Sequence, residues 1–183
     1  MKDNYLKQAW LVLLLALCFG GVLAGVEHSL KGRIDENKKA DTLGQIPNLV
    51  PGAVSASFSN GVYRAVTQNG DHAGWVLLVT GQGFADKVEL LLGLNADASQ
   101  ITGVYILDQK ETPGLGNKIV EDEWRAQFAG KSTQQPLEIV KRKAEKDNEI
   151  EAVTGATISS ETVKDMVNRA AADFRRQLAS GGF

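Results

Sequence analysis

The sequence is short of the residues that build most metal and catalytic sites. It has one cysteine, Cys18, and two histidines, His28 and His72, among 183 residues. A single cysteine excludes a disulfide within the chain and any zinc or iron–sulfur site built from cysteines. Two histidines leave little for a histidine-rich metal site or for histidine-centred catalysis. We therefore expect no resident metal and no complete catalytic centre on this chain.

An excess of positive charge is also missing. Lysine and arginine number 20 against 22 aspartate and glutamate residues, so the formal net charge is −2. Proteins that bind nucleic acids normally carry a marked basic excess, and we expect no nucleic-acid partner. Hydrophobic residues make up 43% and charged residues 23%, which is ordinary for a globular protein and excludes a disordered chain. The length suits one compact domain with an appendage.

The appendage is an uncharged run near the N-terminus. No residue from position 8 to position 26 is charged, and residues 10–19 are apolar throughout. As a helix rising about 1.5 Å per residue, residues 9–26 span roughly 27 Å, enough for a slightly thin hydrocarbon core. A secretory signal peptide cleaved after Ala24 is the alternative. The length of the run favours an uncleaved transmembrane anchor over residues 1–27, and Lys2 and Lys7 favour a cytoplasmic N-terminus.

A polar stretch separates this run from the globular part. Residues 28–43 are rich in charge and carry only a thin apolar stripe, so residues 28–53 are expected to form a stalk helix or linker. Pro47 and Pro51 should end any helix there. The globular domain is assigned to residues 54–183.

The domain alternates between β-rich runs and turn signals. Residues 62–67 and 74–80 flank Asn69-Gly70-Asp71, and an Asn-Gly pair supplies the positive φ angles of a tight hairpin turn. The last helix is the clearest element, because apolar residues recur there at helical spacing. The pattern predicts an α+β domain with one mostly antiparallel sheet and packed helices. Further strands are expected at residues 88–94, 101–107 and 137–140, and helices at residues 117–128 and over Val163, Met166, Val167, Ala170, Phe174 and Leu178.

The segment before the last helix is a candidate anion site. Residues 154–160, TGATISS, place a glycine and four hydroxyls at a helix start, where free N–H groups and the positive helix end favour a phosphate. A plain capped helix start is the alternative, since Ser159 or Ser160 is well placed to cap. Residues 81–86 lack the final glycine of a dinucleotide fingerprint and are expected to form a turn.

Two motifs resemble those of a known family. Residues 151–160, EAVTGATISS, are similar to the (D/E)xx(S/T)GAT signature of FMN-binding domains, in which the FMN phosphate is joined to a threonine. Residues 111–116, ETPGLG, are similar to the other hallmark of that family. Together with the N-terminal run, the motifs resemble the G subunit of the Rnf (Rsx) ion-translocating electron transport complex. The C subunit of the sodium-pumping NADH:quinone reductase shares both motifs and is the second candidate.

The resemblance implies a role for each matched residue. Thr157 would carry the FMN as a phosphoester, and a flavin transferase that makes this bond would read Glu151 and the TGAT segment. Thr157 is also favoured by position, because Ser159 and Ser160 suit the helix cap and Thr154 is expected to belong to the incoming strand. The other residues implied to bind the cofactor are Thr154, Gly155, Ala156, Ser159, Ser160, Glu111, Thr112, Pro113, Gly114, Leu115 and Gly116.

The function implied by the resemblance is electron transfer. The chain would relay electrons through its covalent FMN on the outer side of the bacterial cytoplasmic membrane, with lipid around its N-terminal helix. Partner subunits of a Rnf-type complex would handle ferredoxin, NAD and ion movement. Two alternatives stay open: an independent exported FMN-dependent reductase, and a non-redox binding or scaffold protein in which the TGAT segment only begins a helix.

Overall fold

The structure divides into two units, residues 1–40 and residues 41–183. The computed structural model describes residues 4–181. Helix α1, Asn4–Leu49, begins in the first unit and ends in the second. An 18-residue window of this helix has a mean hydropathy of 2.4, and none of the window is buried. By length and composition, α1 can therefore cross a membrane.

The end of α1 differs from expectation. Pro47 lies inside the helix, which continues to Leu49, so the expectation that Pro47 ends the helix is wrong. The physical reason is tertiary packing, because Ile46, Leu49 and Val50 are all buried against the domain. Burial of these side chains outweighs the single backbone hydrogen bond that a proline removes. The last turns of α1, from Asp41 onward, are thus part of the second unit.

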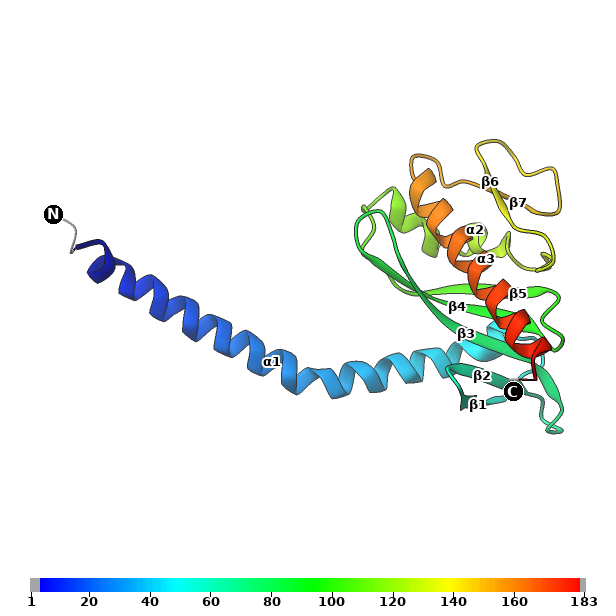
Figure 1. Cartoon of the computed structure of the whole chain (residues 1–183), viewed down its shortest axis with the longest axis horizontal. Helices are drawn as coiled ribbons and strands as arrows, with labels where there is room; N and C mark the ends of the chain where they lie inside the picture. The colour runs from blue at the N-terminus through cyan, green and yellow to red at the C-terminus, as the bar shows by residue number, and fades with distance from the viewer. Residues whose placement is uncertain (1–3, 182–183) are drawn as a thin grey trace. The chain divides into compact units, whose positions relative to one another are not determined.

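The second unit is built on a five-stranded sheet (Figure 1). Each strand pairs antiparallel with the next along the chain, so the fold class expected from the sequence is confirmed. The hairpin at Asn69-Gly70 is also confirmed, because Val66 pairs with His72 and Gly70 has a φ of +84°. The strands are β1 Ser55–Ser59, β2 Val62–Val66, β3 His72–Gln82, β4 Lys87–Asn95 and β5 Ile101–Asp108.

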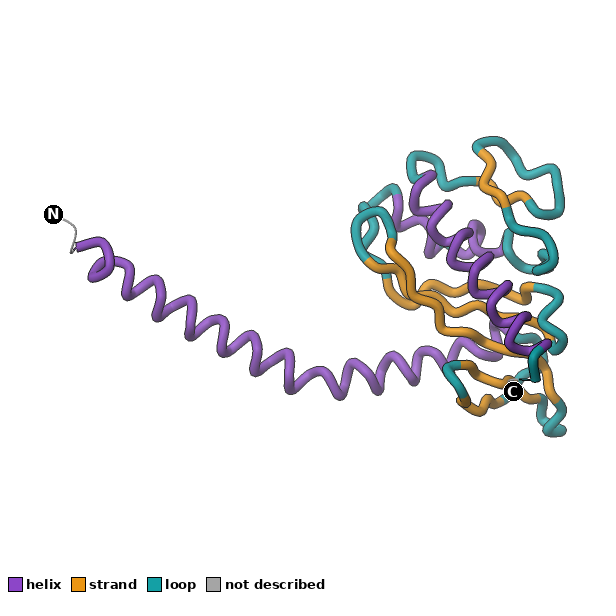
Figure 2. Tube along the Cα trace, in the orientation of Figure 1, coloured by secondary structure: helices purple, strands orange, loops and turns teal. Residues whose placement is uncertain are grey.

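The chain between β5 and the last helix consists mostly of loops, as Figure 2 shows. The helix expected over residues 117–128 is divided into a 3₁₀ helix and a short α-helix, because Glu121 between them has an extended backbone with ψ of 134°. Two short strands then pair in parallel, and the second is the strand expected before the TGAT segment, although it ends before Thr154. These elements are η1 Gly116–Val120, α2 Asp122–Ala126, β6 Glu138–Val140, β7 Glu149–Glu151 and α3 Thr157–Ala179.

Both faces of the sheet are covered. Helix α3 packs on one face, where the alternate residues Leu90, Leu92 and Leu94 of β4 join a core that includes Phe174 (Figure 1). The end of α1 packs on the other face, where Leu91 lies in a second buried cluster. This alternation along β4 is the two-residue period of a strand buried on both sides. The turn between β3 and β4 and the start of α3 both line the cavity that is described next.

Candidate functional site

A cavity of about 470 Å³ lies where the two sequence motifs meet. Its walls come from the turn between β3 and β4, the loop between β5 and η1, and the start of α3. The fold thus brings together two motifs that are far apart in the sequence. The lining residues are Phe84, Thr112, Leu115, Gly116, Gly155, Ala156, Thr157, Ile158 and Ser159.

Some residues assigned to the cofactor from the sequence lie outside this lining. Glu111 and Ser160 are buried in the protein, and the other three are exposed beside the cavity. Direct contact of these five residues with a cofactor stays a prediction. They are Glu111, Pro113, Gly114, Thr154 and Ser160.

Large apolar side chains form the rim of the cavity. Phe84 is 62% exposed, Ile158 is 55% exposed and Leu115 is 45% exposed. Sequence reasoning missed Phe84 and Ile158, although a large apolar residue in the turn after Gly83 was a usable signal. Clustered apolar groups that remain in contact with water mark a binding surface, and a flat aromatic ring suits them. The half-buried Thr157 lies beside this rim.

The start of α3 corrects the expected helix cap. The helix begins at Thr157, its N-cap residue is Ala156, and the N-cap makes no side-chain hydrogen bond. Ser159 and Ser160 do not cap the helix, because the Ser159 hydroxyl donates to Glu111 and the Ser160 hydroxyl donates to the Ala156 carbonyl at 3.0 Å. Thr154 lies in a turn after β7 and does not belong to the strand.

The first turn of α3 is suited to an anion. The N–H groups of Thr157, Ile158 and Ser159 have no acceptor within the helix by helix geometry. Gly155, with a φ of +80°, lets the chain turn sharply into the helix, and a Cβ there would lie 2.9 Å from Leu115 Cδ2. Unpaired N–H groups and the positive end of a long helix together attract a phosphate. The Thr157 hydroxyl is at the first position of this turn.

Glu111 ties three segments of the site together. Its side chain is 4% exposed, with Oε1 accepting the Ala85 N–H at 3.2 Å and Oε2 accepting the Ser159 hydroxyl at 2.6 Å. Two glycines make room for it: a Cβ at Gly83 would lie 2.2 Å from Glu111 Oε1, and a Cβ at Gly116 would lie 2.9 Å from Oε2. Glu111 thus holds the β3–β4 turn, its own loop and α3 in one arrangement.

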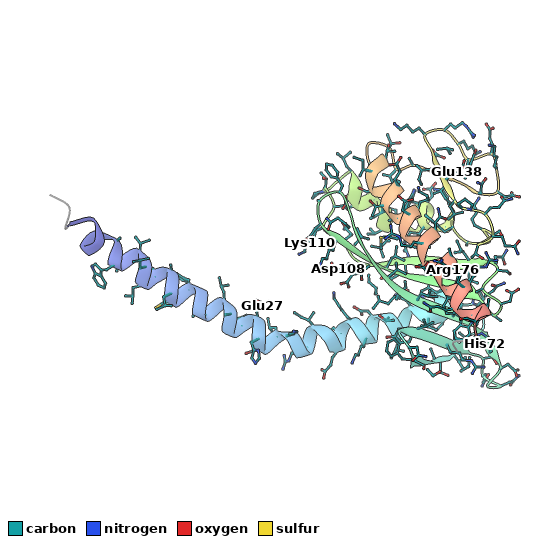
Figure 3. All side chains as sticks on the ribbon, in the orientation of Figure 1. Glu27, His72, Asp108, Lys110, Glu138 and Arg176 are labelled. Atoms are coloured by element: carbon teal, nitrogen blue, oxygen red, sulfur yellow. The ribbon has the colours of Figure 1, made fainter. Side chains whose placement is uncertain are left out.

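A charge pair lies at the free end of the β3–β4 hairpin. The Lys110 ammonium lies 3.3 Å from the Asp86 carboxylate, and Figure 3 labels Lys110 beside the hairpin. The pKa of Asp86 is below its ordinary value because the Lys87 N–H donates to the carboxylate and Lys110 pairs with it. Both side chains are exposed to water, so this ion pair contributes little to the stability of the domain.

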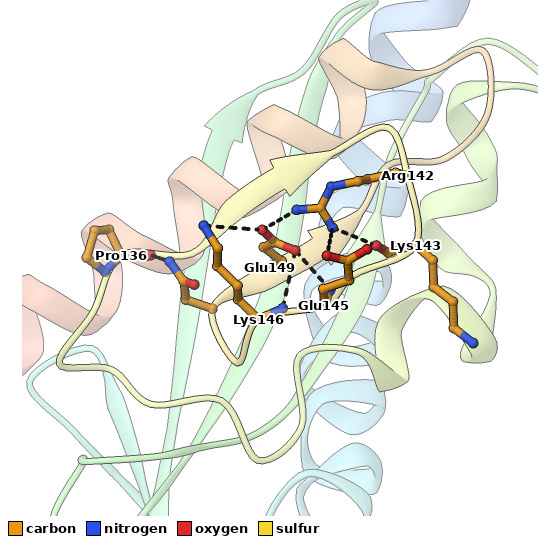
Figure 4. A network of polar contacts seen from close by, with 7 residues as sticks. Pro136, Arg142, Lys143, Glu145, Lys146 and Glu149 are labelled. Carbon is orange, nitrogen blue, oxygen red and sulfur yellow. Dashed lines mark hydrogen bonds and ion pairs between the residues drawn. The ribbon is translucent and has the colours of Figure 1, made fainter.

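A second acidic group is buried at the start of β7, where the preceding loop meets the strand. Glu149 is 2% exposed and accepts hydrogen bonds from the Glu145 N–H at 2.9 Å and from Arg142 Nη2 at 2.7 Å (Figure 4). The Glu145 N–H and the Arg142 guanidinium lower the pKa of Glu149 to about 2. This network fixes the loop that leads through β7 into the acceptor segment. In the described residues, 4–181, no three His, Cys, Asp or Glu side chains gather to hold a metal ion.

These features define a class of protein. A hydroxyl at an uncapped helix start, beside an exposed apolar rim, is the arrangement of a domain that binds an aromatic cofactor with a phosphate tail. Residues 83–172 match the family model of the FMN-binding domain.

Relatives of the chain belong to redox complexes. One relative is the G subunit of the Na(+)-translocating ferredoxin:NAD(+) oxidoreductase complex of Acetobacterium woodii. This chain is 44% identical to it over 103 residues, which cover 55% of this chain and 48% of that protein. The chain thus spans about half the length of that relative. It is 26% identical over 218 residues to the G subunit of the ion-translocating oxidoreductase complex of Pseudoalteromonas atlantica, with 100% of both chains covered.

A solved structure shares the fold. The crystal structure of the C subunit of the Na(+)-translocating NADH-quinone reductase of Parabacteroides distasonis superposes with a TM-score of 0.54 at 22% identity. The superposition covers 62% of this chain and 60% of that chain. The likeness is therefore one of fold, over about three fifths of each chain.

Proposed function

We propose that this chain is a membrane-anchored flavoprotein subunit that relays electrons in an ion-translocating oxidoreductase complex of the ferredoxin:NAD type. The single observation that carries the proposal is the cavity between residues 111–116 and the start of α3, with Thr157 on its wall. The relatives named as G subunits support the complex, and the matched family supports the cofactor.

The residues present fit FMN. The N–H groups in the first turn of α3 would bind its phosphate, and Phe84, Leu115 and Ile158 would hold its ring and exclude water from one side. FMN, when bound, supplies reversible acceptance and donation of electrons at the ring. The protein sets where the ring lies and how polar its surroundings are, and both properties tune the potential.

Thr157 is the proposed point of covalent attachment. Of the four hydroxyls in the segment, those of Ser159 and Ser160 are buried and already hydrogen-bonded, and Thr154 does not line the cavity. Thr157 is half-buried, lines the cavity and begins the helix. A phosphodiester on this hydroxyl keeps the FMN on a domain outside the cytoplasm, where free FMN is scarce. A flavin transferase that reads Glu151 and the TGAT segment would make the bond.

The proposed location follows from the apolar run. An uncleaved α1 would span the bacterial cytoplasmic membrane with its N-terminus inside, lipid around residues 9–26 and the FMN domain on the outer side. The anchor is proposed to occupy residues 1–27, the stalk residues 28–53 and the domain residues 54–183, with the last turns of α1, from Asp41 onward, packed on the domain. N-terminal sequencing of the mature protein tests the anchor, and a chain that begins at Gly25 would contradict it.

The test of the function uses the full chain, produced together with a flavin transferase. We expect the denatured wild-type chain to fluoresce as a flavin on a gel, and Thr157→Val to fold without this fluorescence. Ser159→Ala is the matched control and should keep the flavin, because it leaves Thr157 and the TGAT segment intact. A fluorescent Thr157→Val chain, or an FMN adduct found on another residue by peptide mass spectrometry, would refute Thr157.

Purification of the tagged full chain from membranes separates the two redox functions. Copurification with multi-span membrane subunits is expected for the complex. A flavinylated chain that purifies alone would favour the independent exported reductase. A wild-type chain without flavin would favour the scaffold protein.

A further inference from the structure

The backbone of Glu151 is held by side chains from the α2 region. Its N–H donates to Gln127 Oε1 at 2.7 Å, and its carbonyl accepts the Trp124 Nε1–H at 2.8 Å. The Gln127 amide nitrogen also lies 3.5 Å from the same carbonyl oxygen. Gln127 is the C-cap residue of α2, and Trp124 lies within that helix. We refer to these contacts as the Gln127–Trp124 clamp.

The clamp replaces a missing strand. Among the residues that the structure describes, β7 pairs only with β6, in a two-stranded sheet where the Ala152 N–H donates to the Val140 carbonyl at 2.8 Å. In a parallel pair, alternate residues of a strand face the partner, so Glu151 directs its N–H and carbonyl toward the opposite edge. Gln127 presents an acceptor and a donor there, as a strand would. Both backbone groups of Glu151 are therefore satisfied.

The clamp holds one end of the acceptor segment, residues 151–157. Between β7 and α3 this segment has no regular structure apart from a turn. Two residues after Glu151, the Val153 N–H donates to the Ser160 hydroxyl of α3 at 3.0 Å. A groove of about 280 Å³ runs along the segment and is lined by Trp124, Gln127 and Thr154, among others. The Glu151 side chain is exposed at this groove.

We propose that Gln127, with Trp124, is a positioning residue for attachment of the flavin: it holds the acceptor segment in the conformation that a flavin transferase binds. This inference rests on the proposed function. The attachment needs an activated phosphoryl donor, and FAD, in which FMN is joined to AMP through a pyrophosphate, is suitable. The bond from Thr157 Oγ1 to the FMN phosphorus forms, the pyrophosphate P–O bond breaks, AMP leaves and the hydroxyl proton passes to solvent. No electron is transferred.

Loss of the clamp should weaken recognition without changing the chemical step. Without the hydrogen bond to Gln127, the segment spends only a fraction of its time in the binding conformation, and the apparent affinity falls by that fraction. KM for the acceptor chain should therefore rise while kcat stays unchanged. We expect an increase of roughly five- to tenfold, which corresponds to about 1–1.4 kcal/mol at 1.4 kcal/mol per factor of ten.

The experiment uses the full-length chain without flavin, in detergent, with a purified flavin transferase and FAD. Gln127→Met keeps the side-chain length and removes both hydrogen bonds, whereas Gln127→Glu keeps the acceptor for the Glu151 N–H. Gln177→Ala, at an exposed position of α3, is the matched control. In-gel flavin fluorescence gives KM and kcat, and hydrogen exchange of the Glu151 amide reports the clamp without any flavin.

The expected pattern is specific. Gln127→Met should raise KM and speed hydrogen exchange of the Glu151 amide. In Gln127→Glu both KM and the exchange rate should lie close to the wild-type values, and Gln177→Ala should match wild type. If the wild-type chain takes up flavin and Gln127→Met has the same KM, the inference is overturned and the proposed function stays intact. This holds even if the Glu151 amide exchanges faster in Gln127→Met. A lowered kcat at unchanged KM also overturns it. A wild-type chain that takes no flavin from FAD overturns the proposed function and the inference with it.

Discussion

The Ser159 hydroxyl donates a 2.6 Å hydrogen bond to the carboxyl group of Glu111, 48 positions earlier in the chain, and both side chains are buried. This bond links the loop of residues 111–116 to the first turn of α3, so the two walls of the cavity are fixed to each other. Ser159 therefore serves the site by holding the wall that carries Thr157, and a direct bond to a cofactor would require it to leave Glu111.

Ser159→Ala should destabilise the domain and keep the flavin. The substitution leaves Glu111 Oε2 buried without its donor, which costs about 1–3 kcal/mol for an unsatisfied buried group. Urea unfolding should show a lower midpoint, while the denatured chain should still fluoresce as a flavin because Thr157 is intact. A wild-type midpoint would contradict the bond.

A double-mutant cycle with Glu111→Gln isolates the pair. Glutamine keeps an acceptor for the Ala85 N–H and places an amide opposite Ser159, so its own effect should be smaller in the Ser159→Ala background. We expect a coupling energy of about 0.5–3 kcal/mol, the range for residues in contact. Additive effects of the two substitutions would show that the residues act separately.

Gly116 and Gly114 should respond differently to alanine. A Cβ at Gly116 would lie 2.8 Å from Ser159 Oγ and 2.9 Å from Glu111 Cβ, so the packed groups must move. Gly114 has a φ of +77° but open space around its Cβ position, so the cost there is only the backbone conformation, about 1–2 kcal/mol. In urea unfolding, Gly116→Ala should have a lower free energy of unfolding than Gly114→Ala. The reverse order would contradict the packing at Gly116.

The sequence predicted the elements that local patterns determine. The Asn69-Gly70 turn fixed the β2–β3 hairpin, and the helical spacing from Val163 to Leu178 marked α3. β1, Ser55–Ser59, was missed because it is short and mostly exposed at the sheet edge, and Ala56 and Phe58 between serines are too short an alternation to mark a strand. The continuation of α1 through Pro47 was missed because its cause is burial against strands that come later in the chain.

The candidate site shows the same division. The two motifs were recognisable from the sequence, and the fold places Thr112, Leu115, Gly116 and Thr157 around one cavity. The partners of individual side chains were not predictable, because Ser159 bonds across 48 positions and Gln127 across 24. A local reading made Ser159 a helix cap, the most common role for a serine at a helix start. Long-range hydrogen bonds gave it a different role.

The end of α1 should be a stabilising part of the domain. Leu49 is 4% exposed and lies over the paired glycines Gly93 and Gly103. Leu49→Ala should lower the free energy of unfolding by about 2–5 kcal/mol, the range for a buried leucine truncated to alanine. Calorimetric or urea unfolding of the full chain in detergent measures this effect, and a change below about 0.5 kcal/mol, typical of surface substitutions, would contradict the packing.

The two glycines give a matched pair for this contact. A Cβ at Gly93 would lie 2.8 Å from the Leu49 carbonyl oxygen, which is backbone, whereas a Cβ at Gly103 would lie 3.1 Å from the tip of the Leu49 side chain. The tip can move and the backbone cannot do so cheaply. Gly93→Ala should therefore cost about 1–3 kcal/mol, and Gly103→Ala should cost less. Equal effects at the two positions would contradict this arrangement of Leu49.

Glu149 should make the domain sensitive to acid. Hydrogen bonds from the Glu145 N–H and from Arg142 lower its pKa from the ordinary 4.5 to about 2 in the folded protein. A carboxyl group whose pKa is lowered by folding stabilises the folded state fully above its unfolded pKa. That contribution is lost as the pH falls from about 4.5 toward 2. Glu149→Gln lacks this contribution at every pH, so its melting temperature should lie several degrees below that of wild type above pH 5.

The difference between the two melting curves isolates Glu149 from the other carboxyl groups. Between pH 5 and pH 2 the wild type should lose stability faster than Glu149→Gln, and the two melting temperatures should converge near the lower limit. Glu145→Gln is the control, because it removes the exposed carboxylate that lies 3.5 Å from Arg142 and keeps the backbone N–H that Glu149 accepts. This control should follow the wild-type pH dependence. A constant difference between wild type and Glu149→Gln from pH 7 to pH 2 would mean that Glu149 stabilises the loop by packing and hydrogen-bond geometry and not by its charge.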